Sequence, residues 1–214
     1  MLFRSLIHWK RIEFFKVLVI TIDKKNGIFL FCQVIIKHLL RPVSSIEKPN
    51  SFPVDQWHGG RVQFIRSNVI HLMRGEIYDI DGKKIFCFGG GYSLDKDYRV
   101  PGRTWWPQEM PDDGEYRNAT KNLEECGFTV DYILTHTAPA DTVEYMSRLN
   151  LGIKNSVVEE FPLTSYLQWI VETVRYDKWF FGHFHIDAEI WRNQYAVLDS
   201  IRELHTGELI KNRC

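Results

Sequence analysis

The sequence predicts an α/β fold, and two patterns in it carry this prediction. Residues 131–134 and 178–181 are short apolar runs typical of buried strands, and in each case one residue separates the run from a histidine. Between them, residues 163–176 carry apolar side chains at helical spacing. In open α/β sheets ligands collect at the carboxyl ends of strands. We therefore expect the chemistry of this chain at the ends of these two strands.

The first fifty residues are not typical of the start of such a fold. They contain one glycine, Gly27, although tight turns between strands and helices need several. Residues 16–23 predict a buried strand ending in Asp23, and residues 28–40 form an apolar run of ambiguous period. We expect a single domain in which residues 1–50 are an atypical N-terminal segment and residues 51–214 form the main body.

The part of the chain from residue 51 to residue 88 is rich in short β-type runs. The predicted strands are residues 62–65, 69–73, 76–80 and 83–88, after a turn at residues 57–60. The last two strands should form a hairpin, because Asp81-Gly82 between them is a pair that two-residue hairpin turns favour. Gly89-Gly90-Gly91 follows and is interpreted as a turn, with a phosphate-binding loop as the alternative.

Residues 92–115 show no clear periodicity, and irregular segments of this length are usually functional or disordered. The two tryptophans at residues 105–106 argue against disorder. We interpret the segment as a lid beside the site, with Arg99 and Arg103 as candidate contacts to an anionic substrate. The alternative is that both arginines simply face solvent.

Helical and hairpin patterns follow. We expect helices at residues 118–126, 141–149 and 163–176, the second with Asp141 as its N-cap, and a hairpin formed by residues 188–191 and 195–198.

Three histidines follow the two apolar strands. Gly182-His183-Phe184-His185 supplies two of them and His136 the third. Neutral imidazole is the commonest metal ligand, and histidines one residue apart on an extended segment project to the same side. The alternative is that these histidines are satisfied by water or by a carbonyl group. Because two strands end in this way, we favour a metal site made by His136, His183 and His185.

These segments resemble a known family. Leu134-Thr135-His136-Thr137-Ala138-Pro139 and Gly182-His183-Phe184-His185 are similar to the last two of the five metal-binding blocks of the calcineurin-like metallophosphoesterases, in the same order. The resemblance runs from about residue 52 to residue 208. It implies a two-layered β-sandwich flanked by helices, two divalent metal ions of the Mn, Fe or Zn type, and a small phosphoester as substrate. By motif position, His136 and His183 would bind one metal and His185 the other.

The resemblance does not extend to residues 1–50, where the Asp-x-His, Gly-Asp and Gly-Asn-His blocks are absent. Asp23 follows a strand as the aspartates of those blocks do, which makes it a candidate metal ligand, but Ile22 and Lys25 stand where the blocks have glycine and histidine. Two dications without a bridging anion repel each other. We therefore expect incomplete metal occupancy and impaired hydrolysis of phosphomonoesters or phosphodiesters. The alternative is a non-catalytic binding protein with the same fold.

A different hydrolase class shares part of the pattern. The segment from His183 to Asp187 also fits the His-x-His-x-Asp start of a metallo-β-lactamase zinc site, but Ala188 stands where that motif has another histidine.

The composition of the chain indicates which partners and which cellular compartment to expect. The chain is 44% hydrophobic and 25% charged with a formal net charge of zero, so we expect neither a nucleic-acid surface nor a membrane surface. The apolar runs before residue 41 are interrupted and too short for a membrane span. Four widely spaced cysteines without a Cys-x-x-Cys motif indicate a reducing compartment, and we expect a cytoplasmic protein.

Overall fold

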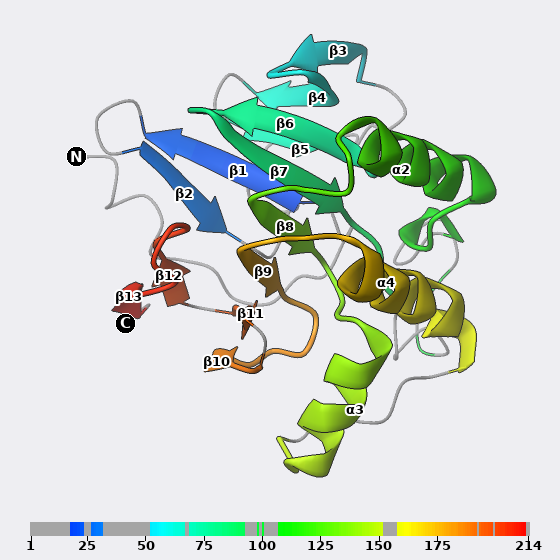
Figure 1. Ribbon diagram of the computed structural model, residues 1–214, viewed down its shortest axis with the longest axis vertical. Helices are drawn as coiled ribbons and strands as arrows, with labels where there is room; N and C mark the ends of the chain where they lie inside the picture. Colours follow the sequence, from blue (N-terminus) through cyan, green and yellow to red (C-terminus); the bar gives the residue numbers. More distant parts are fainter. Residues whose placement is uncertain are drawn as a thin grey trace.

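The structure, a computed structural model, describes residues 18–23, 27–31, 52–66, 69–92, 98, 100, 107–151, 158–191, 193–198 and 200–212. Over these residues the chain forms a five-stranded sheet, a six-stranded sheet, a two-stranded hairpin and a few helices (Figure 1). The predicted α/β class is confirmed. Among the described helices, none has the length and apolar character needed to cross a membrane.

The five-stranded sheet is antiparallel throughout the pairs that define it. Its order is β2 (Gly27–Phe31), β1 (Leu18–Asp23), β5 (Val69–Leu72), β4 (Gly60–Arg66) and β3 (Val54–Trp57). The turn predicted at residues 57–60 joins β3 to β4, with His58 and Gly59 at positive φ, as a tight hairpin turn requires. Because β1 pairs with β5, the strand that ends in Asp23 belongs to the same sheet as β3 to β5.

The six-stranded sheet is mixed. Its order is β10 (Ala188–Glu189), β11 (Gln194–Ala196), β9 (Lys178–Phe181), β8 (Tyr132–Thr135), β7 (Lys83–Phe88) and β6 (Glu76–Ile80). β7, β8, β9 and β11 are parallel, and the edge strands β6 and β10 are antiparallel to their neighbours. The predicted hairpin across Asp81-Gly82 is confirmed, with both turn residues at positive φ.

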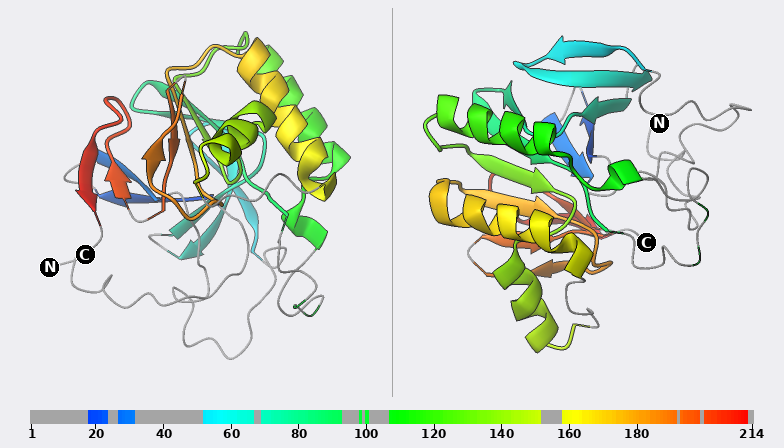
Figure 2. Two further views of the ribbon diagram at one scale, coloured as in Figure 1. Left: turned by 90° about the horizontal axis from the view of Figure 1, so that it is seen from below. Right: turned by 90° about the vertical axis from the view of Figure 1, so that its right-hand side faces the viewer.

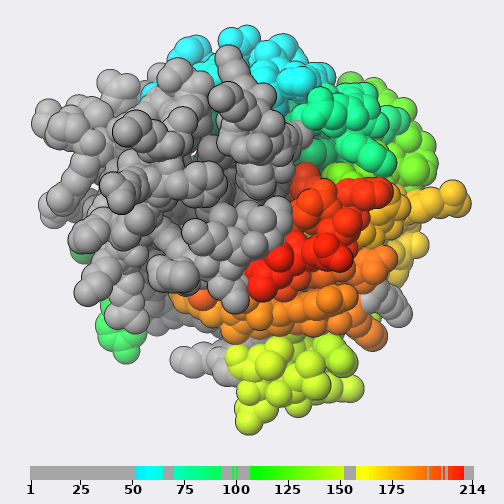
Figure 3. All heavy atoms as spheres, turned by 90° about the vertical axis from the view of Figure 1, so that its left-hand side faces the viewer, coloured from blue at the N-terminus to red at the C-terminus, as the bar shows by residue number. Residues whose placement is uncertain are grey.

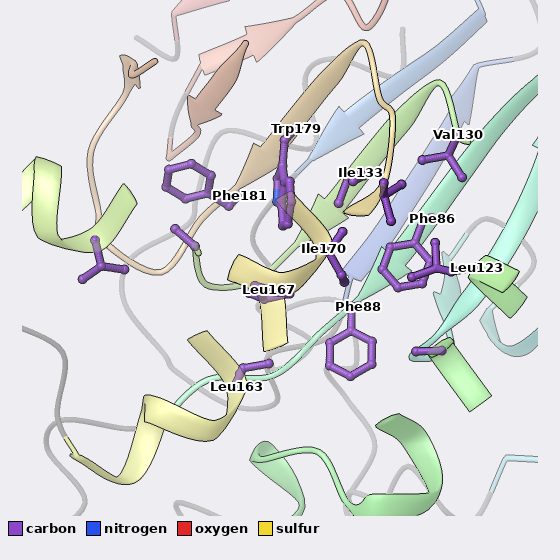
Figure 4. Packing of buried hydrophobic residues seen from close by; sticks show 14 of the residues in the cluster. Phe86, Phe88, Leu123, Val130, Ile133, Leu163, Leu167, Ile170, Trp179 and Phe181 are labelled. Atoms are coloured by element: carbon purple, nitrogen blue, oxygen red, sulfur yellow. The ribbon is translucent and has the colours of Figure 1, made fainter. Parts of the chain in front are cut away.

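Side chains of the central strands alternate between two hydrophobic cores. On β7 and β8, Ile85 and Leu134 join a cluster with residues of the five-stranded sheet, whereas Phe86 and Ile133 join a cluster with the helices. Figure 4 shows this second cluster, in which Trp179 of β9 lies among residues from several elements. Both faces of the parallel strands are therefore covered, which explains why these strands are continuous apolar runs in the sequence.

The helices cover the face of the six-stranded sheet that is turned away from the five-stranded sheet (Figures 1 and 2). They are α2 (Asp113–Glu125), α3 (Ala140–Arg148) and α4 (Phe161–Thr173), with the short 3₁₀ turns η4 (Pro107–Glu109) and η5 (Val158–Glu160). The structure thus has two sheets that share one core and a helical layer that encloses the other.

Two helix starts differ from the prediction. The helix expected at residues 118–126 begins at Asp113, because Asp112 caps the Glu115 amide and the Glu115 side chain caps the Asp112 amide in return. The second helix begins at Ala140, after Pro139, so Asp141 lies in its first turn and is not the N-cap. The Asp141 amide donates instead to Gln168 Oε1 at 3.2 Å.

The C-terminal end adds two elements. The hairpin predicted at residues 188–198 is confirmed as β10 and β11, although both strands are shorter than expected. β12 (Ser200–Arg202) and β13 (Leu209–Asn212) form a further hairpin that was not predicted, and it lies at the surface (red in Figure 3). Its connection contributes Leu204 to the core between the two sheets.

Candidate functional site

The candidate site lies where the parallel strands β7, β8 and β9 end, and their arrowheads in Figure 1 point the same way. The start of β8 is anchored to the preceding hairpin by Asp131, which accepts from Lys83 Nζ at 2.6 Å and from the Lys84 amide at 2.8 Å. Burial opposes ionisation of Asp131, yet these hydrogen bonds hold its pKa below the usual value. β8 then runs fully buried to Thr135, and His136 follows it with 9% exposure.

A hydrogen-bond chain fixes the end of β8 against β9. Trp179 Nε1 donates to Thr135 Oγ1 at 2.7 Å, and the Thr135 hydroxyl donates to the Thr137 carbonyl at 2.6 Å. One residue beyond each of these strands, the Gly182 amide donates to the His136 carbonyl at 3.0 Å. The turns that carry His136 and His183 are therefore joined through their backbones.

The segment after β9 is not an extended strand. β9 ends at Phe181, and residues 183–185 form bends in which His183 and His185 adopt φ values of 67° and 56°. The expectation that these histidines project to one side of an extended segment was therefore wrong. Positive φ is uncommon for residues other than glycine, and such strained backbone gathers at functional sites.

The structure brings His136 and His183 together. His183 Nδ1 lies 3.2 Å from His136 Nε2, and the two ring centroids are 5.0 Å apart at an interplanar angle of 67°. This distance suits a hydrogen bond between neutral imidazoles. It also fits one shared cation, because two nitrogens each about 2.0–2.1 Å from a tetrahedral metal lie roughly 3.3 Å apart. The two rings thus present a ready pair of nitrogen ligands.

A buried carboxylate lies on the far side of the His183 ring. Glu160 is 3% exposed, and its Oε1 is 3.5 Å from His183 Nε2. The same oxygen accepts from the Tyr92 amide at 3.0 Å. Glu160 could not be predicted from the sequence, because Glu159 and Glu160 are adjacent and no local pattern shows which of them the fold turns inward.

The other predicted site residues are placed differently. His185 has an exposed side chain, and Asp23 ends β1 at the hairpin turn of the five-stranded sheet, whereas the histidines follow strands of the six-stranded sheet. Arg99 and Arg103 lie outside the described residues. Among the residues that the structure describes, no group of three or more His, Cys, Asp or Glu side chains is arranged to hold a metal ion.

The glycine run after β7 has no assigned secondary structure, so the turn expected at residues 89–91 is not observed. The Gly91 amide donates to the Glu109 carbonyl at 3.1 Å, and Gly90 has a φ of 121°. A Cβ atom on Gly90 would lie 3.0 Å from that same carbonyl oxygen, so the close approach of η4 requires glycine here. The amide of Gly91 is directed at the backbone of η4, which argues against a phosphate-binding role for it.

Asp187, the aspartate of the metallo-β-lactamase-like pattern, makes backbone contacts in the structure. Its Oδ1 accepts from the Leu198 amide at 2.9 Å, from the Ser200 amide at 3.1 Å and from the Ser200 hydroxyl. These bonds tie the segment after β9 to the end of β11. The aspartate therefore has a structural role in the turn before β12.

Comparisons of the chain with family models, with curated proteins and with solved structures found no match.

Proposed function

We propose that this chain is a metal-dependent phosphoester hydrolase of the metallophosphoesterase-like type, with weak activity. The observation that supports this most directly is the 3.2 Å approach of His183 Nδ1 to His136 Nε2 at the ends of adjacent parallel strands. The two sheets with a common core and the outer helices agree with the sandwich that the family resemblance implies.

His136 and His183 would hold one divalent ion of the Mn, Fe or Zn type, with His185 and Asp23 as further candidate ligands. Such an ion supplies a Lewis acid that polarises a phosphoryl oxygen and stabilises the charge that develops on it. The chain contributes two imidazoles that follow buried strands. The neighbouring rings of Phe181 and Phe184 pack against each other, with their centroids 5.9 Å apart. Arg99 and Arg103 remain candidate contacts to the anionic substrate.

The expectation of weak activity follows from the ligand set. Within the part of the chain that the structure describes, no group of three or more His, Cys, Asp or Glu side chains is arranged to hold a metal ion, and two dications without a bridging anion repel each other. The same observation favours the second candidate function, a non-catalytic binding protein that holds a single ion.

The assay is the hydrolysis of bis(p-nitrophenyl) phosphate with and without Mn²⁺. The proposal predicts slow turnover that depends on the metal and is lost in His136→Ala and His183→Ala. His205→Ala is the matched control, because His205 is an exposed histidine at the turn between β12 and β13 and its removal should leave the rate unchanged.

Metal binding without metal-dependent turnover would support the non-catalytic candidate. Turnover that survives both alanine substitutions would show that the histidine pair is not the site of hydrolysis.

A further inference from the structure

Glu160 combines burial, charge and position in an unusual way. It is 3% exposed and stands at the N-cap of α4, but its side chain makes no capping hydrogen bond to that helix. The side chain reaches His183 and the Tyr92 amide instead. A buried carboxylate is costly, and the positive end of the α4 dipole reduces this cost.

We propose that Glu160 is a positioning residue that sets the tautomer and the orientation of His183. An unprotonated Nε2 would direct its lone pair at the buried carboxylate, and this arrangement is repulsive. The neutral ring therefore carries its proton on Nε2 and keeps Nδ1 unprotonated, facing His136 Nε2. Histidines that bind metals commonly donate their other ring N–H to a carboxylate in this way. The inference rests on the metal site proposed above.

The same carboxylate connects two strand ends. Glu160 Oε1 accepts from the amide of Tyr92, which follows the three glycines after β7, while its contact with His183 reaches the segment after β9. The Gly182 amide in turn bonds to the His136 carbonyl after β8. Glu160 thus helps to hold three neighbouring strand ends in register around the imidazole pair. The 3.5 Å separation from His183 Nε2 is long for a hydrogen bond and leaves room to shorten when Nδ1 binds a cation.

Two variants separate the charge from the shape. Glu160→Gln keeps the size and one oxygen acceptor but removes the charge, and Glu160→Ala removes both. Glu76→Gln is the matched control, since Glu76 of β6 is also buried, at 6% exposure, and accepts hydrogen bonds from Arg61 of β4 and Asn118 of α2.

The first readout is zinc affinity by isothermal titration calorimetry. Glu160→Ala should weaken zinc binding about 10- to 100-fold, which is the usual cost of losing such a partner, and Glu160→Gln should weaken it less. Glu76→Gln should leave the affinity within about twofold of the wild-type value, as expected of a residue that makes no contact with the histidines.

The second readout is the set of imidazole ¹⁵N chemical shifts of the zinc-free protein at a fixed pH, assigned with the histidine variants. Wild-type His183 should be the Nε2–H tautomer, and this preference should be lost in Glu160→Ala. A role in stability alone would not move the tautomer. If circular dichroism shows that Glu160→Ala does not fold, the His183 tautomer is measured in Glu160→Gln instead.

The two proposals fail in different ways. Absence of zinc binding to the wild-type protein would contradict the metal site. The ¹⁵N chemical shifts would still test whether Glu160 sets the tautomer of His183. Zinc binding that is equally tight in the Glu160 variants, with an unchanged His183 tautomer, would overturn the positioning role while leaving the metal site in place.

Discussion

At the residue scale, the positions of His136 and His183 could be predicted because the signal is local. A buried strand that stops at a histidine places that side chain at the sheet edge whatever the rest of the fold does. The backbone turn at His183 could not be predicted, because its positive φ is imposed by contacts between segments far apart in the chain. Glu160 was missed for the same reason, since its burial is decided by the packing of α4.

His71 is a histidine of β5 with a structural role in the five-stranded sheet. Its Nδ1 lies 2.7 Å from Gln63 Oε1 on the neighbouring strand β4. Burial, and then the positive charge of Arg74, lower the pKa of His71 from 6.5 to about 4. The folded state therefore resists a proton that the unfolded state accepts.

This shift predicts a pH dependence of stability. Between pH 6.5 and about 4 the unfolded state binds more protons at His71, so the free energy of unfolding falls as the pH falls through this window. The part due to His71 amounts to at most about 3 kcal/mol. Urea unfolding at pH 7.5, 6, 5 and 4 should show a shallower loss in His71→Asn, whose amide can still donate to Gln63. An identical loss in both proteins would contradict the assignment.

At the element scale, turn chemistry was more predictable than helix starts. The Asp81-Gly82 hairpin was found because the turn residues and the flanking strands are contiguous. The predicted start of α2 was wrong, because apolar periodicity begins only at residue 118, whereas the capping box of Asp112 and Glu115 starts the helix five residues earlier. The parallel pairing of β11 with β9 joins residues on either side of the strand β10 and has no local signal.

A substitution at Gly75 tests how closely α2 packs against the end of the six-stranded sheet. The Gly75 carbonyl accepts from Asn118 Nδ2 at 3.4 Å and from Asn122 Nδ2 at 2.6 Å, so the helix lies directly against it. A Cβ atom on Gly75 would lie 2.9 Å from the backbone of Ala119. Gly82 has a similar φ, 74° against 77°, but a Cβ atom there would meet nothing within 4 Å.

Gly75→Ala and Gly82→Ala therefore share the cost of a left-handed backbone and differ in the clash. We expect Gly75→Ala to lower the free energy of unfolding by about 1–3 kcal/mol more than Gly82→Ala, because overpacking at the helix adds to the backbone strain. Urea denaturation of both variants measures the difference. Equal losses would mean that α2 is not packed against Gly75 as described.

At the scale of the whole molecule, the α/β class could be predicted but the pairing of the sheets could not. The strand ending in Asp23 was expected, yet its place beside β5 depends on long-range contacts that composition does not encode. The six-stranded sheet separates two hydrophobic cores. Ile133 of β8 packs in the core with the helices, and the next residue, Leu134, packs in the core with the five-stranded sheet.

This arrangement predicts cooperative unfolding of the two cores. Ile133 and Leu134 are both fully buried, so Ile133→Ala and Leu134→Ala should each cost about 2–5 kcal/mol. Since both residues belong to one strand, each variant should shift far-ultraviolet circular dichroism and tryptophan fluorescence transitions together. Transitions that separate in either variant would show that the two cores unfold independently.

The central claim is that His136 and His183 form one metal site, and the most direct measurement is anomalous diffraction from a crystal grown with zinc. We expect an anomalous peak about 2.0–2.1 Å from both His136 Nε2 and His183 Nδ1. Peaks found only elsewhere on the protein, with the two imidazoles hydrogen-bonded to each other and no peak between them, would contradict it.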